Sequence, residues 1–388
     1  MKFLFREFTF FGKKLSTAVI IWFVLAMTAI IIEVSKNVFN NYLIYKGVFW
    51  HTIHQTNLFS LYPSEYFDCN HYGPFFSLII APFALLPDKF GCLLWGFFNA
   101  IILFLAINKL SIEDKKKNII FLITAVEMMT SQHNVQFNPI LTACIILSYV
   151  FVCERKEIWA TLFISIGIMT KIYGIVGIAF FMFSDHKFKF IGYFIFWMIL
   201  LFVLPMLFSS PQFIIQSYYD WLQSLIEKNN SNQDSVMQGM TAMRFIKKSL
   251  SIPELKDTYI IAVAGLVYLI SIFRISQLKN DTFRINYLAF LLIGLVIFSS
   301  SAESPTYIIA MTGVAFWYIT QDYKKLWVNG ILILAIMFTS FSTTDFFPKL
   351  IKTEFIRPFA IKAMPCLIVW ILLSIQLLFK KYHLKFNK

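Results

Sequence analysis

The sequence predicts an all-α integral membrane protein, in which residues 1–388 form a single membrane domain of about twelve transmembrane helices. Three observations support this fold class. Of the 388 residues, 58% are hydrophobic and 14% are charged, whereas a soluble domain is about half apolar and about a quarter charged. The apolar residues form continuous runs, which favours helices over a transmembrane β-barrel. The basic residues gather in the short segments between those runs.

The net charge of +13 indicates topology and not nucleic-acid binding. The segments predicted to be cytoplasmic contain 21 of the 34 Lys and Arg residues but only 8 of the 21 Asp and Glu residues. With both ends basic, we expect an inner-membrane protein whose two termini face the cytoplasm. These segments are 1–14, 109–118, 154–157, 185–189, 274–284, 320–325 and 380–388.

The predicted spans follow from the length of the apolar runs. Crossing a hydrocarbon core of about 30 Å takes about 20 apolar residues, although shorter helices can cross within a packed bundle. Three runs, 118–130, 157–170 and 173–184, are short, and we expect their ends to stop near a cavity inside the bundle. The first run has no small-residue cleavage site after it and is expected to stay uncleaved. The candidate spans are 16–35, 89–108, 118–130, 139–153, 157–170, 173–184, 189–208, 258–274, 285–299, 305–319, 326–341 and 361–380.

Two long loops, 36–88 and 209–257, are predicted on the external side. The first contains two candidate interfacial helices, Asn41–Gln55 and Pro74–Leu86. In Asn41–Gln55, an apolar stripe lies opposite a polar stripe that includes His51. Pro74–Leu86 covers only about 20 Å at about 1.5 Å per residue, so it is expected to lie in the membrane surface. The second loop is large enough to form a lid over a cavity.

Lys171 ends one apolar run, and the next run begins almost immediately. A charge at membrane depth costs from about 2.5 kcal/mol upward, so a lysine in this tight reversal favours an anionic ligand such as phosphate. The alternative is a lysine that extends its ammonium group to the membrane interface.

The other polar candidates also lie at the external ends of spans. Gln132 and Asn134 carry amides, which both donate to and accept from sugar hydroxyls; the alternative is a polar turn that caps two helices. Asp68 and His71 are three residues apart and suit an acid/base pair, or else an N-cap and a turn. Glu303 lies between two spans and is either a catalytic acid or base, or a solvated loop residue.

The five cysteines have no metal-ligand spacing, and Cys69 alone lies clearly in an external loop. The cysteines therefore imply neither a firm metal-ligand set nor a disulfide framework, no cofactor is expected, and metal dependence stays open. The cysteines are Cys69, Cys92, Cys144, Cys153 and Cys366.

An ordered set of short motifs resembles glycosyltransferase family 87 over about residues 41–244. The family's first-loop signature reads roughly Asp-Phe-x-x-Tyr, then Tyr-x-Pro, then Pro-Leu-x-x-Leu-Pro, and its later motifs are a Gly-Gln-x-Asn turn, a lysine that ends the fifth span and a Ser-Leu…Arg loop. The corresponding residues here are Asn41–Tyr45, His71–Pro74, Ala81–Pro87, Ser131–Asn134, Lys171, and Ser235–Met237 followed by Arg244.

The resemblance implies a GT-C membrane fold whose active site faces the exterior, and a polyprenyl-phosphate sugar as donor. It further implies transfer of a mannose-like hexose to a lipid-linked or envelope glycan acceptor, with membrane lipid and no nucleic acid among the partners. One departure matters. The family has an aspartate, the expected general base, at the position of Asn41, and an amide cannot accept that proton. Ser131 also replaces a glycine, and the proline expected after Lys171 is absent.

The resemblance thus implies a site with three parts: a phosphate-binding pair, a set of groups that position sugar or acceptor, and the catalytic positions. Because Asn41 cannot act as a base, Asp68 is the first choice for that role and Glu303 the second. In the order of the three parts, the residues are Lys171 and Arg244; His71, Tyr72, Gln132 and Asn134; and Asp68, Glu303 and Asn41.

Three alternatives remain open at this point. A lipid-linked oligosaccharide polymerase or ligase is expected to use clusters of external arginines, and only Arg244 and Arg357 are predicted outside. A transporter is expected to show internal repeats and charged residues at the membrane midplane, and neither is evident. A catalytically altered homologue is consistent with Asn41.

Overall fold

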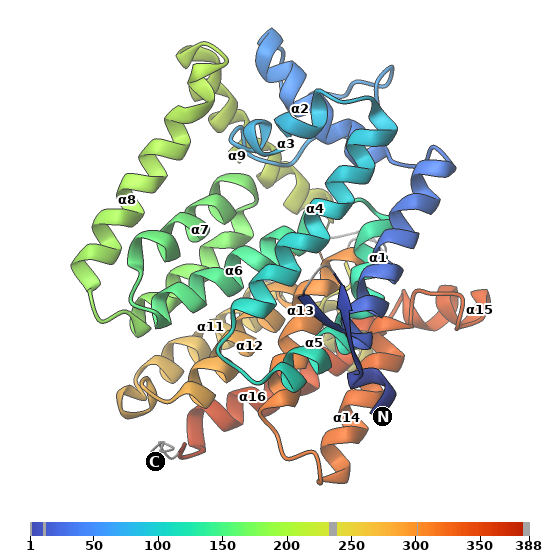
Figure 1. The fold of residues 1–388 in the computed structure, drawn as a ribbon, viewed down its shortest axis with the longest axis vertical. Helices are drawn as coiled ribbons and strands as arrows, with labels where there is room; N and C mark the ends of the chain where they lie inside the picture. Colours follow the sequence, from blue (N-terminus) through green and yellow to red (C-terminus); the bar gives the residue numbers. More distant parts are fainter. Residues whose placement is uncertain (1, 11–12, 233–238, 301, 383–388) are drawn as a thin grey trace. The chain divides into compact units, whose positions relative to one another are not determined.

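A computed structural model describes residues 2–10, 13–232, 239–300 and 302–382 of the chain (Figure 1). The described chain is helical apart from a two-stranded antiparallel hairpin near the N-terminus. The predicted α-helical membrane protein is therefore confirmed, with this hairpin as the exception. Internal contacts divide the chain into two compact units. The first contains Met1–Trp22, Ile112–Met128 and Asn232–Lys388, and the second contains Phe23–Ser111 and Met129–Ser231.

The second unit contains most of the predicted site residues. Two helices, α1 (Thr17–Ser35) and α5 (Asp114–His133), run from the first unit into the second. The remaining elements of the second unit are α2 (Asn40–His54), α3 (Phe76–Ala84), α4 (Asp88–Lys109), α6 (Asn138–Cys153), α7 (Glu157–Thr170), the 3-10 helix η2 (Ile172–Phe183), α8 (Lys187–Val203), the 3-10 turn η3 (Leu204–Leu207) and α9 (Pro211–Asn232).

The first unit begins with the 3-10 turn η1 (Lys2–Phe5) and the hairpin strands β1 (Glu7–Phe10) and β2 (Lys13–Ser16), in which Glu7 pairs with Ser16. Its core is formed by α12 (Asp281–Ile297) and α13 (Tyr307–Ile319), which pack along each other, and by α16 (Met364–Phe379), which contacts both. The other elements and their bounds are α10 (Ala242–Ser249), α11 (Asp257–Ile272), η4 (Ile275–Gln277), η5 (Ser304–Thr306), α14 (Leu326–Ala335), η6 (Ile336–Ser340), α15 (Lys349–Ile351), η7 (Lys352–Ile356) and η8 (Ile361–Ala363).

All twelve predicted spans fall on helical segments, and 157–170 coincides with α7. Four helices of the described chain are long and apolar enough to cross a membrane, and several others are apolar but shorter. The number of crossings and their direction stay predictions. The four long helices are Thr17–Ser35, Asp88–Lys109, Lys187–Leu207 and Ile361–Phe379.

The prediction that 118–130 is a short helix is wrong. Helix α5 has 20 residues, because it continues past both ends of the apolar run. At its start, Asp114 lies in the first turn, where an acidic residue interacts favourably with the helix dipole, and good helix formers follow. At its other end, the helix includes Ser131–His133, which were predicted to be part of a turn.

The reversal between α7 and η2 is as tight as the sequence suggested. Helix α7 ends at Thr170, and Lys171 adopts an extended conformation before the 3-10 helix begins. The backbone of Gly174 lies directly against the backbone of Gly167 on α7, so a Cβ atom at Gly174 would overlap Gly167. The absence of a side chain therefore permits the two short helices to pack this closely.

The first loop contains helices close to both predicted positions, α2 and α3. The placement of His51 in the polar stripe of α2 is wrong, because the structure buries its side chain. The ring of His51 packs against Tyr62 with centroids 4.0 Å apart, and its Nε2 atom lies 3.1 Å from Glu65. Residues 62–65 of the same loop cover this face of α2, which the helical pattern alone could not show.

A buried ion pair joins distant parts of the first unit. Lys362 Nζ lies 2.7 Å from Glu127 Oε1, and neither side chain is exposed. Lys362 also donates to the backbone oxygen of Thr339 at 2.8 Å and lies over the Tyr307 ring. The pair connects α5 to the segment that precedes α16.

Candidate functional site

Lys171 is positioned by the end of α7, where the chain leaves the helix. Its ammonium group donates to Asn138 Oδ1 at 2.9 Å. It also lies 5.8 Å from the centre of the Tyr72 ring and 5.2 Å from that of Tyr173, within the range of cation–π attraction. The lysine is thus surrounded by residues from three parts of the second unit.

Tyr72 reaches Lys171 because its loop lies against the end of α7. Gly73 donates its backbone N–H to the Thr170 oxygen at 3.0 Å, and a Cβ atom on Gly73 would overlap the Met169 carbonyl. The hydroxyl groups of Tyr72 and Tyr45 lie 3.1 Å apart. The glycine of the His71–Pro74 motif therefore permits the contact that places its tyrosine beside the lysine.

His71 is held by helix α9. The indole N–H of Trp221 donates to the His71 backbone oxygen at 3.0 Å, and His71 Nδ1 lies 3.3 Å from the Ser224 hydroxyl. Burial, reinforced by the positive charge of Lys228, lowers the pKa of His71 to about 4. The imidazole is consequently neutral near pH 7.

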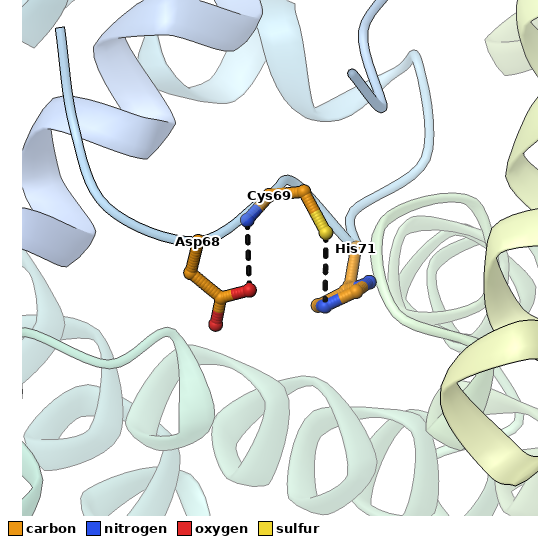
Figure 2. A group of neighbouring side chains, drawn as sticks. All are labelled: Asp68, Cys69 and His71. Carbon is orange, nitrogen blue, oxygen red and sulfur yellow. Dashed lines mark hydrogen bonds between the residues drawn. The ribbon is translucent and has the colours of Figure 1, made fainter. Parts of the chain in front are cut away.

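Asp68 lies in the same loop and is exposed. Its φ angle is 74°, in the left-handed region, and its Oδ1 atom accepts the backbone N–H of Cys69 at 2.8 Å. Cys69 Sγ in turn lies 3.7 Å from His71 Nε2 (Figure 2). Asp68 and His71, predicted as an acid/base pair, thus lie on either side of Cys69 in one short loop.

Asn41 and Asn134 contact each other, although 93 residues separate them. Asn41 Nδ2 donates to the Asn134 backbone oxygen at 2.7 Å, and the Asn134 side chain donates to the Thr130 oxygen at the end of α5. Gln132 is buried and donates to the Gly96 oxygen on α4 at 2.7 Å. Both side-chain amides therefore have protein partners.

Sequence reasoning missed the pair formed by Glu33 and His133. Glu33 Oε1, in the last turns of α1, lies 2.7 Å from His133 Nδ1 at the end of α5. The pair stands next to Asn134, on which Asn41 docks. A single acid inside an otherwise apolar span was the available signal, since such a residue is costly without a partner.

Arg244 and Glu303 lie in the first unit, on two segments that are bonded to each other. Gly239 and Ala302 form a parallel bridge, and Met240 N donates to the Ala302 oxygen at 3.0 Å. Arg244, whose N–H is capped by the Thr241 hydroxyl at 3.1 Å, folds its guanidinium group over Gly239. Glu303 follows Ala302 directly.

The predicted site residues are therefore divided between the two units. Lys171, His71 and Tyr72 lie together in the second unit, whereas Arg244 and Glu303 lie in the first. Convergence of Lys171 and Arg244 on one phosphate stays a prediction. The Ser235–Met237 part of the predicted arginine loop lies outside the described residues.

Comparison with protein families supports the resemblance. Residues 70–300 match the family described as Glycosyltransferase family 87, which confirms the predicted family over more than half of the chain. The matched range includes Lys171 and Arg244, whereas Asn41, Asp68 and Glu303 fall outside it. A comparison with curated proteins found no match.

Proposed function

The chain belongs to glycosyltransferase family 87, a GT-C membrane family, and on this basis we propose a specific transfer reaction. The donor is a polyprenyl-phosphate sugar that carries a mannose-like hexose. The acceptor is a lipid-linked or envelope glycan, and the reaction takes place on the extracytoplasmic face of the membrane. The placement of Lys171 between Tyr72 and Asn138 carries this proposal, because a cation held beside an aromatic ring and an amide suits a sugar phosphate.

A lipid-linked donor is favoured over a soluble nucleotide sugar. Within the described chain, the segments that join helices on the predicted cytoplasmic side contain only a few residues each, too few for a nucleotide-binding domain. These segments are 110–113, 154–156, 184–186, 273–280 and 320–325.

In the proposed reaction, the acceptor hydroxyl oxygen attacks the anomeric carbon of the donor sugar. The bond from that carbon to the phosphate oxygen breaks, and polyprenyl phosphate leaves with the bonding electrons. Lys171 and Arg244 offset the charge that develops on the leaving phosphate. His71, Tyr72, Gln132 and Asn134 are proposed to position the sugar or the acceptor.

The acceptor proton passes to a base, for which we propose Asp68, with Glu303 as second choice. Asp68 shares a loop with Tyr72, which contacts Lys171, and its exposure leaves the carboxylate accessible to an acceptor. Asn41, at the position of the family's aspartate, is proposed to support the turn at Asn134 through its hydrogen bond.

The test measures sugar transfer by the purified full-length protein from polyprenyl-phosphate mannose to lipid acceptors. Asp68→Asn should slow transfer by about 10²- to 10⁴-fold, the usual contribution of a general base, while donor binding persists. Glu303→Gln should have a smaller effect. Asp220→Asn is the matched control. Among the contacts described, the Asp220 carboxylate on α9 accepts hydrogen bonds only from the side chains of Asn57 and Gln216, and neither is a predicted site residue.

The reverse ranking would move the base to Glu303. Full activity in both single variants and in the double variant would refute this mechanism and point to the catalytically altered homologue. Transfer from a nucleotide sugar without any lipid donor would refute the proposed donor.

A further inference from the structure

The loop between α2 and α3 brings together three side chains that commonly bind metal ions. The ligand atoms of Asp68, Cys69 and His71 all lie within 4.8 Å of one another. Figure 2 shows the Asp68 carboxylate and the His71 imidazole on the same side of the loop, with the Cys69 sulfur facing the imidazole. The cysteines showed no metal-ligand spacing in the sequence, and the backbone of Asp68 adopts a left-handed conformation within this cluster.

The separation of the sulfur and nitrogen ligands suits a tetrahedral ion. Zinc binds sulfur at about 2.3 Å and imidazole nitrogen at about 2.0–2.1 Å, so two such ligands at the tetrahedral angle lie about 3.6 Å apart. Cys69 Sγ and His71 Nε2 are 3.7 Å apart in the structure. We propose that Asp68, Cys69 and His71 form a binding site for a divalent zinc-class ion, with water in the fourth position.

The choice of metal follows from the donor atoms. A thiolate and an imidazole favour zinc and similar transition ions, whereas magnesium and calcium prefer oxygen ligands. The carboxylate of Asp68 and a Cys69 thiolate together supply two negative charges beside a neutral imidazole, which balance a divalent cation. The positive charges of Lys228 and Lys171 act on His71 from nearby and oppose the binding of a cation. The site therefore depends on the negative charges of Asp68 and Cys69.

Helix α9 supplies the supporting contacts that a metal site requires. The Ser224 hydroxyl lies 3.3 Å from His71 Nδ1, and with Nδ1 as donor the Nε2 lone pair faces Cys69. The Trp221 indole holds the backbone of His71 at 3.0 Å. Such contacts orient a metal-binding histidine and select its tautomer, and their loss costs about 10- to 100-fold in metal affinity.

Cobalt(II) is a suitable probe, because a cobalt–thiolate bond gives an intense charge-transfer band and tetrahedral cobalt gives characteristic visible bands. The purified full-length protein should bind one cobalt ion per chain with these bands, and zinc should displace it. Cys69→Ser should remove the charge-transfer band, and His71→Gln should weaken binding at least tenfold. Cys153→Ser and His54→Gln are the matched controls and should bind cobalt like the parent.

Ser224→Ala leaves all three ligands in place and should weaken binding by about 10- to 100-fold. This variant keeps the test decisive if substitution of a ligand unfolds the protein. A parent protein without the thiolate band, or binding that survives both Cys69→Ser and His71→Gln, would overturn the proposal. A bound metal ion would occupy the Asp68 carboxylate, which the proposed function assigns to proton transfer. The two proposals are therefore tested separately: metal binding by the cobalt spectrum, and the proposed function by the rate of sugar transfer.

Discussion

Two acid–base pairs with the same 2.7 Å separation differ in their access to solvent. Glu127 and Lys362 in the first unit are fully buried, with no exposed area on either side chain. Glu33 and His133 in the second unit retain 14% and 35% exposure. The two pairs therefore have the same separation between acid and base, but one is enclosed by protein and the other is partly exposed.

The difference in exposure separates a fully buried pair from one whose two side chains keep part of their surface accessible. The Glu127 carboxylate has one oxygen on Lys362, and its other oxygen is buried without a hydrogen-bond partner in the described chain. Such a pair recovers its desolvation cost only through its own geometry, so loss of one member leaves an uncompensated charge. Glu33 and His133 are partly exposed, and the energetic contribution of an exposed pair is small.

The largest effect is expected from Lys362→Met. This change leaves Glu127 buried without its cation, and removing one partner of a buried pair costs about 3–5 kcal/mol. We expect a marked fall in the unfolding temperature in detergent, or little folded protein by size-exclusion chromatography. Lys46→Met, which removes a partly exposed partner of Asp88, is the matched control and should unfold close to the parent.

Combining Glu127→Gln with Lys362→Met removes both charges and should restore much of the lost stability. A single Lys362→Met variant as stable as the parent would show that the buried pair does not hold the first unit together.

An intermediate effect is expected from Lys171→Ala, which removes a cation from the second unit. Each charge-assisted contact to phosphate contributes about 1.5–3 kcal/mol, so transfer should slow about ten- to a hundredfold while the protein stays folded. Lys171→Arg keeps the charge and should retain more activity, and Lys46→Ala tests for a general charge effect. Transfer by purified Lys171→Ala at the parental rate would support the interfacial lysine instead.

The smallest effect is expected from Glu33→Gln and His133→Gln. A partly exposed pair contributes at most about 1 kcal/mol to stability, so the unfolding temperature should change little. Transfer should fall by up to about tenfold, because the pair fixes the turn on which Asn41 docks and small displacements near a reacting group slow catalysis. A loss of stability as large as that of Lys362→Met would remove the distinction between the two pairs.

The sequence was a good guide to where helices lie and to which loop residues gather. Each of the twelve continuous apolar runs falls on helical structure in the described chain, and the ordered motifs named His71, Tyr72 and Lys171, which lie near one another. Both results depend on local composition or on motif order, which a single sequence displays directly.

The remaining contacts were not predictable, because they join residues far apart in the chain. Gln132 looks like a polar turn residue until its partner, Gly96, is known. His51 follows a polar stripe until residues 62–65 cover it. Periodicity tells which face of a helix is polar, but it does not tell which other segment packs there.

The backbone contact between Gly167 and Gly174 has a consequence for the response to bilayer thickness. Membrane helices adapt to thinner or thicker bilayers by tilting, and packing against neighbours decides how far each can tilt. Because α7 and η2 touch through their main chains at the reversal, the two segments tilt as one body there. Lys171 lies at the reversal between them, so we expect its ammonium group to move together with this body.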